Sequence, residues 1–212
     1  MDGLEALRAR YLGEIGAAAD EAALEAVRLA ALGRKGEISL RMRKLGGMDP
    51  EARKVAGDLV AQIRAELSRE LEYSGPMRAV IVCKYTVPEL SSNASRKSGW
   101  RVSRVSLRPR NPALGGADAW EQKTLLDFER RLVAGEKADA LEHSEIVTEP
   151  GGRYFRFMKA LPTGPLCVSC HGPAERMTDA VRSLLATEYP HDRATGFSAG
   201  QIRGAVTIKR PL

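Results

Sequence analysis

The sequence predicts an α+β protein of 212 residues, in which helices come first and a sheet with an inserted helix follows. Two observations predict this class. Up to about residue 72, apolar residues recur at three- and four-residue steps, which is typical of amphipathic helices. Beyond residue 100, β-rich runs alternate with turn signals and one further helical stretch. Only 5% of the residues are aromatic, so the core must consist mainly of Leu, Val, Ile and Ala.

The first 72 residues are expected to form an antiparallel helical hairpin. Helical spacing of apolar residues extends over the first 45 residues, and glycine pairs interrupt it near residues 33–36 and 46–47. Asp49 followed by Pro50 is typical of a helix start. The helix that begins there carries one apolar stripe, made of Val55, Leu59, Ile63, Leu67 and Leu71. We expect this stripe to pack back against the earlier helices.

The middle of the chain is expected to contain a short helix, a strand and a longer helix. The run Ser74–Gly75–Pro76 ends the preceding helix, and a short helix from Pro76 would be limited by Pro88. Residues 100–107 have the alternation of a strand region. Residues 118–121 have the spacing of a capping box, which predicts a helix as far as about Val133.

The last third of the chain is expected to complete an antiparallel sheet. Two β-rich runs, 145–148 and 154–158, flank the turn signal Pro150–Gly151–Gly152 and predict a hairpin. A helix over residues 178–188 and a last strand over 205–208 follow. This order of elements fits a PAS-like sheet with flanking helices, although the pattern alone does not fix the order of the strands.

Composition narrows the function classes only coarsely. The net charge of +6 and the pI near 9.4 favour contact with nucleic acid, anionic lipid or an acidic protein without choosing among them. No apolar run approaches the roughly 18 residues that would cross a bilayer, so we expect no membrane span. The N-terminal residues lack the basic and apolar regions of a secretory signal, which favours a cytoplasmic location.

A pentapeptide near residue 170 carries the strongest chemical signal. Cys167-Val168-Ser169-Cys170-His171 matches the C-x-x-C-H signature of c-type haem attachment. Two thiols at this spacing can each bond one vinyl group of the same porphyrin, while the adjacent histidine reaches the iron. The sequence therefore predicts one covalent haem c per chain, bound by Cys167 and Cys170, with His171 as an iron ligand.

Two other interpretations of the motif fit its residues less well. A structural zinc site needs four ligands, and the adjacent Cys170 and His171 cannot easily point at one ion. A thioredoxin-like redox pair would follow a strand in a βαβ unit, which residues 161–165 do not resemble.

The second iron ligand is open on the residues alone. Each candidate also has an ordinary structural role: a buried small apolar cysteine, a methionine that fills the core, or a surface histidine. The candidates are Cys83, Met158, Met177, His143 and His191.

The chain from about residue 53 to residue 212 resembles a family of small bacterial and cyanobacterial c-type haem proteins with a PAS-like fold. The resemblance follows a series of segments in order: 74–76 with 79–84, 106–108 with 110–112, 118–121, 155–160, 167–172, 189–190, 194–197 and 202–205. It implies that a cysteine in the early helix, matched by Cys83, is the second ligand to the iron. A thiolate ligand donates electron density and lowers the reduction potential. The sequence departs from the family pattern at Val102-Ser103-Arg104-Val105, where a more regular Gly-Arg-Thr run is expected.

Three arginines near this departure are candidates to bind the haem propionates. Arg104, Arg108 and Arg110 lie close together in the sequence, and guanidinium groups bind carboxylates through paired hydrogen bonds. A solvated basic strand is the alternative interpretation.

Residues 1 to about 60 resemble a different family, the N-terminal coiled-coil arm of the bacterial phenylalanyl-tRNA synthetase alpha subunit. The resemblance is carried by residues 29–38 and 45–51. It implies contact with tRNA, through phosphate contacts that are electrostatic and largely independent of base sequence. The candidate residues near the expected hairpin tip are Arg34, Lys35, Arg41, Arg43 and Lys44. Nothing after residue 72 resembles the aminoacylation motifs of that family, so no ligase activity is expected.

Together these signals predict a helical arm over residues 1–52 and a PAS-like c-type haem domain over 53–212, which share the helix 50–72. We expect a non-enzymatic redox or gas sensor, or an electron carrier with a redox partner protein; the alternative is a tRNA- or RNA-binding helical module. Covalent haem attachment favours an extracytoplasmic location, whereas the arm and the visible N-terminus favour the cytoplasm. The oligomeric state does not follow from the sequence.

Overall fold

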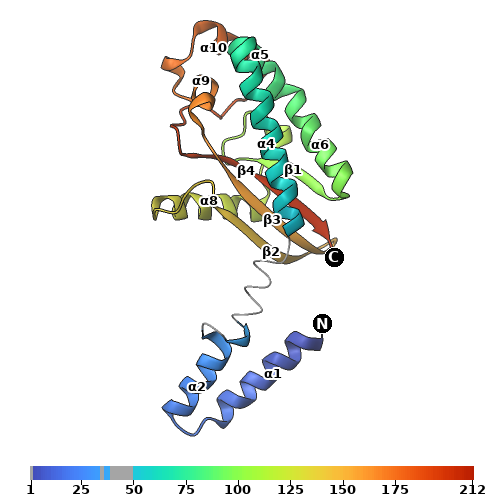
Figure 1. Cartoon of the computed structure of the whole chain (residues 1–212), viewed down its shortest axis with the longest axis vertical. Helices are drawn as coiled ribbons and strands as arrows, with labels where there is room; N and C mark the ends of the chain where they lie inside the picture. Colours follow the sequence, from blue (N-terminus) through green and yellow to red (C-terminus); the bar gives the residue numbers. More distant parts are fainter. Residues whose placement is uncertain (1, 34–35, 39–49) are drawn as a thin grey trace. The chain divides into compact units, whose positions relative to one another are not determined.

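The computed structural model describes residues 2–33, 36–38 and 50–212, and divides the chain into two compact units, Met1–Asp49 and Pro50–Leu212 (Figure 1). In the first unit, α1 (Asp2–Ala17) and α2 (Glu21–Leu32) form a helical hairpin. The α2 helix begins at Asp20, whose side chain accepts a hydrogen bond from the Ala23 amide at 2.7 Å. Leu7 and Tyr11 of α1 and Ala31 of α2 form the small core of this hairpin. The basic residues expected at the tip of the arm all lie outside the described residues.

The second unit contains a four-stranded antiparallel sheet, which confirms the α+β class. Its strands are β1 (Arg101–Val105), β2 (Glu142–Glu149), β3 (Gly152–Pro162) and β4 (Ile202–Pro211). They lie in the order β1-β4-β3-β2, so the last strand of the chain is inserted between the first and the third. Ile208 on β4 pairs with Val102 on one side and with Phe157 on the other.

Three consecutive helices follow one another beside this sheet: α4 (Pro50–Tyr73), α5 (Gly75–Lys84) and α6 (Thr86–Ser98) (Figure 1). The α4 and α6 helices pack on one face of the sheet, and α5 packs against α4, α6 and α10. Leu59 and Ile63 of α4 pack with Phe157 and Ile208 of the sheet. The sequence-based expectation that this apolar stripe would pack back on the earlier helices needs correction, because its buried residues belong to the core of the second unit. Ala52 and Ala56, which are fully buried, let the helix approach the sheet closely.

The α6 helix was not expected, because its sequence is rich in serine and contains a proline. Pro88 lies in the first turn of α6, where backbone N–H groups have no intrahelical acceptor and a proline is tolerated. The hydroxyl of Ser95 donates to the carbonyl oxygen of Ser91 at 2.9 Å, and that of Ser98 donates to Ala94 at 2.8 Å. Serine hydroxyls bound in this way are accommodated inside a helix.

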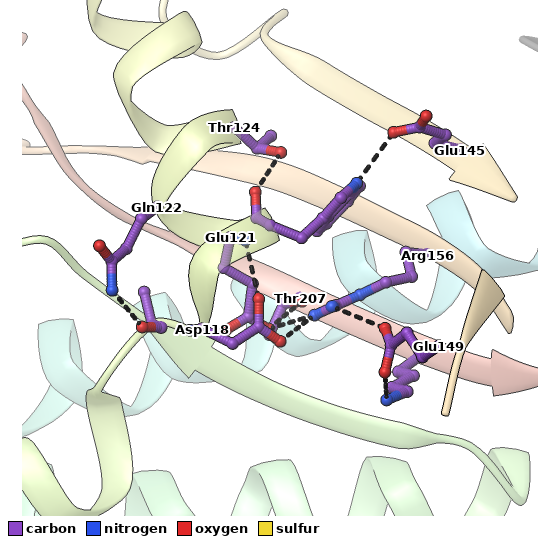
Figure 2. A network of polar contacts seen from close by, with 11 residues as sticks. Asp118, Glu121, Gln122, Thr124, Glu145, Glu149, Arg156 and Thr207 are labelled. Carbon is purple, nitrogen blue, oxygen red and sulfur yellow. Dashed lines mark hydrogen bonds and ion pairs between the residues drawn. The ribbon is translucent and has the colours of Figure 1, made fainter. Parts of the chain in front are cut away.

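The other face of the sheet is covered by α8 (Ala119–Val133), which follows the short α7 (Pro112–Gly115). The expected capping box at the start of α8 is confirmed, because the side chain of Asp118 and that of Glu121 each accept the other's backbone N–H. Phe128 packs with Met158 in the core on this face. Beside this core, the Arg156 side chain lies among several carboxylates (Figure 2).

The segment between β3 and β4 contains short helical turns and one longer helix. It comprises η1 (Pro165–Cys167), α9 (Val168–His171), η2 (Ala174–Arg176) and α10 (Asp179–Glu188). Val181 and Leu185 of α10 pack with Val80 of α5, and Cys170 packs against the same cluster. The cysteine motif is thereby held next to the helix that carries Cys83. None of the helices in the described parts of the chain is long and apolar enough to cross a membrane.

Candidate functional site

The cysteine motif folds as a short continuous helical segment. Cys167 is the last residue of η1, and residues 168–171 form the single turn α9. Cys167 and Cys170 are therefore three residues apart on helical backbone, which places them on one face. Both thiols are free and part-buried. The turn closes at Gly172, whose amide donates to the Val168 carbonyl oxygen at 2.8 Å. A Cβ atom at Gly172 would lie 2.5 Å from that oxygen, so this close approach requires glycine.

The loop before β4 fixes the position of His171. The amide of Phe197 donates to the His171 carbonyl oxygen at 2.8 Å, and the amide of Gly196 donates to Gly172 at 2.7 Å. The Nδ1 atom of the His171 ring lies 2.8 Å from the carbonyl oxygen of Ala194. The Nε atom of Arg203 lies 3.2 Å from the same Nδ1. These two contacts make opposite demands on Nδ1, because the carbonyl needs a donor and the guanidinium needs an acceptor.

The shorter contact decides the tautomer of His171. An unprotonated Nδ1 would place its lone pair against the lone pairs of the carbonyl oxygen at 2.8 Å. We therefore assign the proton to Nδ1, so that Nε2 carries the free lone pair. Burial, together with the nearby charges of Arg203 and Arg110, holds the pKa of His171 well below its usual range. The ring is neutral at physiological pH, and Nε2 is available to a metal ion.

A cavity of about 250 Å³ lies between the motif, the α5–α6 corner and the sheet. His171 lines it from one side, and Cys83 lines it from α5. Burial raises the pKa of the Cys83 thiol, although the charges of Arg104 and Arg110 act in the opposite direction. The rest of the lining combines apolar and cationic side chains with a tyrosine. The apolar ones include Val87, Val102 and Leu161, the cationic ones are Lys84, Arg104, Arg110 and Arg203, and the tyrosine is Tyr189.

Three arginines give the cavity an excess of positive charge. Arg110 donates from Nε to Asp192 at 3.0 Å, and its Nη2 donates to the carbonyl oxygens of Cys170 and Ala194. Arg110 therefore ties the motif to the loop that holds His171. Arg104 has no hydrogen-bond or ion-pair partner within the described residues, and burial lowers its pKa. Arg104 is thus a charged donor group that lines the cavity and has no acceptor in the described protein.

Arg203 completes this cationic wall. Its Nη1 donates to the Ser106 hydroxyl at 3.0 Å and to the Arg108 carbonyl oxygen at 3.2 Å. Burial, with the neighbouring charges of Arg104 and Arg110, lowers the pKa of Arg203 to about 9. The guanidinium therefore remains protonated at neutral pH.

The structure separates the residues that the sequence singled out. Cys83, Arg104, Arg110 and His171 line one cavity, and Cys167 and Cys170 lie on the adjoining turns. Arg108 lies outside the cavity lining, because it is exposed and its guanidinium stacks 3.8 Å above the centre of the Phe197 ring.

Among the five candidates for a second iron ligand, all within the described residues, Cys83 alone lines the cavity. Met158 is buried in the core beneath α8, and Met177 is buried against α10. His143 lies part-exposed on β2, and His191 is exposed.

Arg203 and Tyr189 are among the side chains of the cavity wall that sequence reasoning missed. A charged residue between Ile202 and Gly204, at the start of an apolar strand, was the available signal for Arg203. That Arg203 lies at the cavity follows only from the strand order. The β4 strand lies beside β1, and the backbone at Gly204 approaches Val105. The groups needed for a zinc site do not meet: within the described parts of the chain, no three His, Cys, Asp or Glu side chains cluster as metal ligands.

Comparisons with known proteins give two distinct sets of relatives. The chain is 42% identical over 110 residues to the phenylalanine–tRNA ligase alpha subunit of Cereibacter sphaeroides (strain ATCC 17029 / ATH 2.4.9). It is 57% identical over 110 residues to that of Jannaschia sp. (strain CCS1). Each match covers 52% of this chain and 28% of the relative, so the chain spans less than a third of the length of these curated relatives.

A solved structure and a family model extend the comparison to the part of the chain that contains Cys167 and Cys170. The crystal structure of the cyanobacterial heme-protein Tll0287 matches with a TM-score of 0.57 and 23% sequence identity. This match covers 77% of this chain and 96% of that one, and it shows a shared fold. The model of the Tll0287-like family matches residues 42–211. Since that match includes most of the sequence, the chain belongs to the Tll0287-like family.

Proposed function

We propose that this chain binds one covalent haem c and acts, without catalysis of its own, as a redox or gas sensor or as an electron carrier. The observation that carries the proposal is the placement of Cys83 and His171 on one cavity, with Cys167 and Cys170 on the turns that lead to His171. Haem, when bound, supplies the redox and ligand-binding chemistry. The protein supplies the attachment points, the iron ligands and the polarity of the pocket.

The residues present fit such a group. Two free thiols on one face of a helical turn suit the two vinyl groups, and the neutral His171 presents Nε2 as a ligand atom. The hydrogen bond from Nδ1 to the Ala194 carbonyl oxygen is typical of histidines that bind metals through Nε2. Cys83 provides a sulfur ligand from the α5 side of the cavity.

The arginines have different roles in this proposal. Arg104 has no acceptor in the described protein, so it is the arginine best placed to receive a propionate carboxylate. Arg110 has its Nε and Nη2 donors already engaged by Asp192, Cys170 and Ala194, so it holds the motif in place. Arg108 stacks on Phe197, whose ring meets the His171 ring edge-on with the ring centres 6.4 Å apart.

Optical spectra of the oxidised and reduced protein test this proposal and separate its two forms. Full-length protein is made in cells that contain haem-maturation machinery, and carbon monoxide is added to each state. A carrier keeps both ligands, so its reduced spectrum does not respond to the gas. A sensor is expected to release Cys83 from the iron on reduction and to bind the gas at the coordination position that Cys83 leaves. Purified protein without haem absorbance overturns the proposal in either form.

A second candidate function, binding of tRNA or RNA by the helical arm, is favoured by one specific observation. The matches to phenylalanine–tRNA ligase alpha subunits reach 57% identity over about half of this chain. The proposed contacts are basic residues outside the described structure: Arg34, Lys35, Arg41, Arg43 and Lys44.

A tRNA titration at increasing salt tests this second function. Phosphate contacts make the logarithm of the binding constant fall linearly with the logarithm of salt concentration. Replacing Arg34, Lys35 and Arg41 by Ala is expected to weaken binding and to reduce that slope. The matched control replaces three exposed arginines of the second unit, Arg96, Arg130 and Arg176. Equal effects of the two triple variants, or no binding at low salt, reject the arm as a specific RNA site.

A further inference from the structure

The guanidinium of Arg203 is fixed directly beside His171. Its Nη1 is held by the Ser106 hydroxyl at 3.0 Å and by the Arg108 carbonyl oxygen at 3.2 Å. The Ser106 hydroxyl in turn donates to the backbone carbonyl of Arg203 at 2.8 Å. These bonds fix Nε at 3.2 Å from the Nδ1 atom of His171. The arginine thus has a defined position that does not depend on a bound ligand.

The charge of Arg203 is not neutralised by a carboxylate. Its hydrogen-bond acceptors within the described residues are a hydroxyl and a backbone carbonyl, both uncharged. Asp192, a carboxylate whose charge acts on Arg203, is already bound to Arg110 at 3.0 Å and to the amide of Ala194 at 2.7 Å. A positive charge therefore remains in the part-buried wall behind His171, where solvent screens it weakly.

The positive charge of Arg203 weakens the donation of electron density from the imidazole of His171 to a metal ion bound at Nε2. The Nδ1–H of His171 donates to Ala194, and such a bond increases the basicity of the ring. A cation 3.2 Å from Nδ1 acts in the other direction, because it disfavours any gain of positive charge on the ring. It also favours the state of the iron site that carries one positive charge fewer, which is the reduced state.

We infer that Arg203 is a positioning residue that tunes the redox behaviour of the His171 ligand, by raising the reduction potential that a Cys83 thiolate lowers. This inference rests on the proposed haem function. The step involved is the uptake of one electron from an external reductant, and Arg203 itself forms or breaks no bond and transfers no proton in it. Arg203 contributes a fixed charge through its contact with His171.

A spectroscopic redox titration of the full-length haem-loaded protein at one pH tests the inference. The Arg203→Gln variant removes the charge, so the reduced-to-oxidised ratio at a fixed potential is expected to fall on the order of tenfold, which is about 59 mV for a one-electron couple. The Arg203→Lys variant keeps the charge and is expected to stay near the parent protein. The matched control is Arg193→Gln, which removes an equal charge from an exposed side chain of the loop before β4.

The outcomes separate this inference from the proposed function. A parent protein without haem absorbance overturns both. A haem-loaded parent with equal shifts in Arg203→Gln and Arg193→Gln overturns the role of Arg203 alone. If Arg203→Gln does not fold, Ser106→Ala decides, because it removes one acceptor that fixes the guanidinium. A midpoint in Ser106→Ala that moves away from that of the parent supports the inference, and an unchanged midpoint overturns it.

Discussion

The Nη2 atom of Arg156 lies 3.0 Å from Oε1 of Glu121, and the two side chains are only 3% and 7% exposed. Arg156 also binds Asp118 at 2.7 Å and Glu149 at 3.2 Å, while Glu121 accepts the Thr207 hydroxyl at 2.9 Å (Figure 2). This buried pair joins α8 to β3 and β4 on the sheet face opposite the cavity.

Replacing Arg156 by Met is expected to lower the free energy of unfolding by about 3–5 kcal/mol, because it leaves the Glu121 carboxylate buried without its partner. Denaturant titration measures the change. The control is Arg153→Gln on the same strand, whose side chain is exposed and whose loss is expected to cost less than about 0.5 kcal/mol. Equal midpoints for the two variants would show that the pair is not needed for stability.

Stability is also expected to fall in acid, in part through Asp118. Burial opposes ionisation of this carboxyl, but the hydrogen bonds from Arg156 and from the Glu121 amide outweigh it and lower the pKa of Asp118. A carboxyl with a lower pKa in the folded state contributes stability above its unfolded pKa of about 3.9 and loses it as the pH falls through the folded pKa. Unfolding free energies measured from pH 7 to pH 3 are expected to decline less steeply in Asp118→Asn, which keeps a good N-cap. An identical decline in both proteins would exclude Asp118 as a source.

Local patterns in the sequence were sufficient for the elements whose signals are short-range. The capping box at Asp118 and the turn at Pro150–Gly152 specify their own geometry, and α8 and the β2–β3 hairpin were predicted from them. The α6 helix was missed because serine and proline disfavour helices in isolation, whereas packing of Val87 in the core stabilises this one. The position of β4 between β1 and β3 is set by tertiary contacts and has no local signature.

The residues of the candidate site also differ in whether the sequence alone could predict them. The C-x-x-C-H motif is contiguous, so its residues could be named from the sequence, and Cys83 was named through a family resemblance. The contacts of Arg203 with Ser106 and His171 join segments 97 and 32 residues apart. Such contacts depend on the strand order, which is why the sequence pointed to Arg108 and overlooked Arg203.

His171→Ala is expected to leave the haem attached through its thioethers while the iron loses its imidazole ligand. Because the two attachments are independent, the haem content stays constant and the visible spectrum changes. Added imidazole is expected to restore much of the parent spectrum by occupying the vacated space. His191→Ala, which removes an exposed histidine, serves as the control. An unaltered spectrum in His171→Ala would exclude it as a ligand.

Cys83→Ser is expected to retain haem and to lose the spectral features of a thiolate ligand. Since a thiolate donates electron density to iron, the reduction potential of the variant should rise and carbon monoxide should bind to the reduced form. Met177→Leu, a conservative change at a buried candidate outside the cavity lining, should leave both properties unchanged. A potential that does not rise in Cys83→Ser would contradict sulfur ligation by this residue.

Covalent attachment of haem at Cys167 and Cys170 is tested most directly by the intact mass of the denatured, full-length protein. Protein from cells with haem-maturation machinery is expected to carry the added mass of one haem per chain, and the double variant Cys167→Ala/Cys170→Ala to carry none. A parent protein from the same cells that has only the mass of its polypeptide would contradict this account.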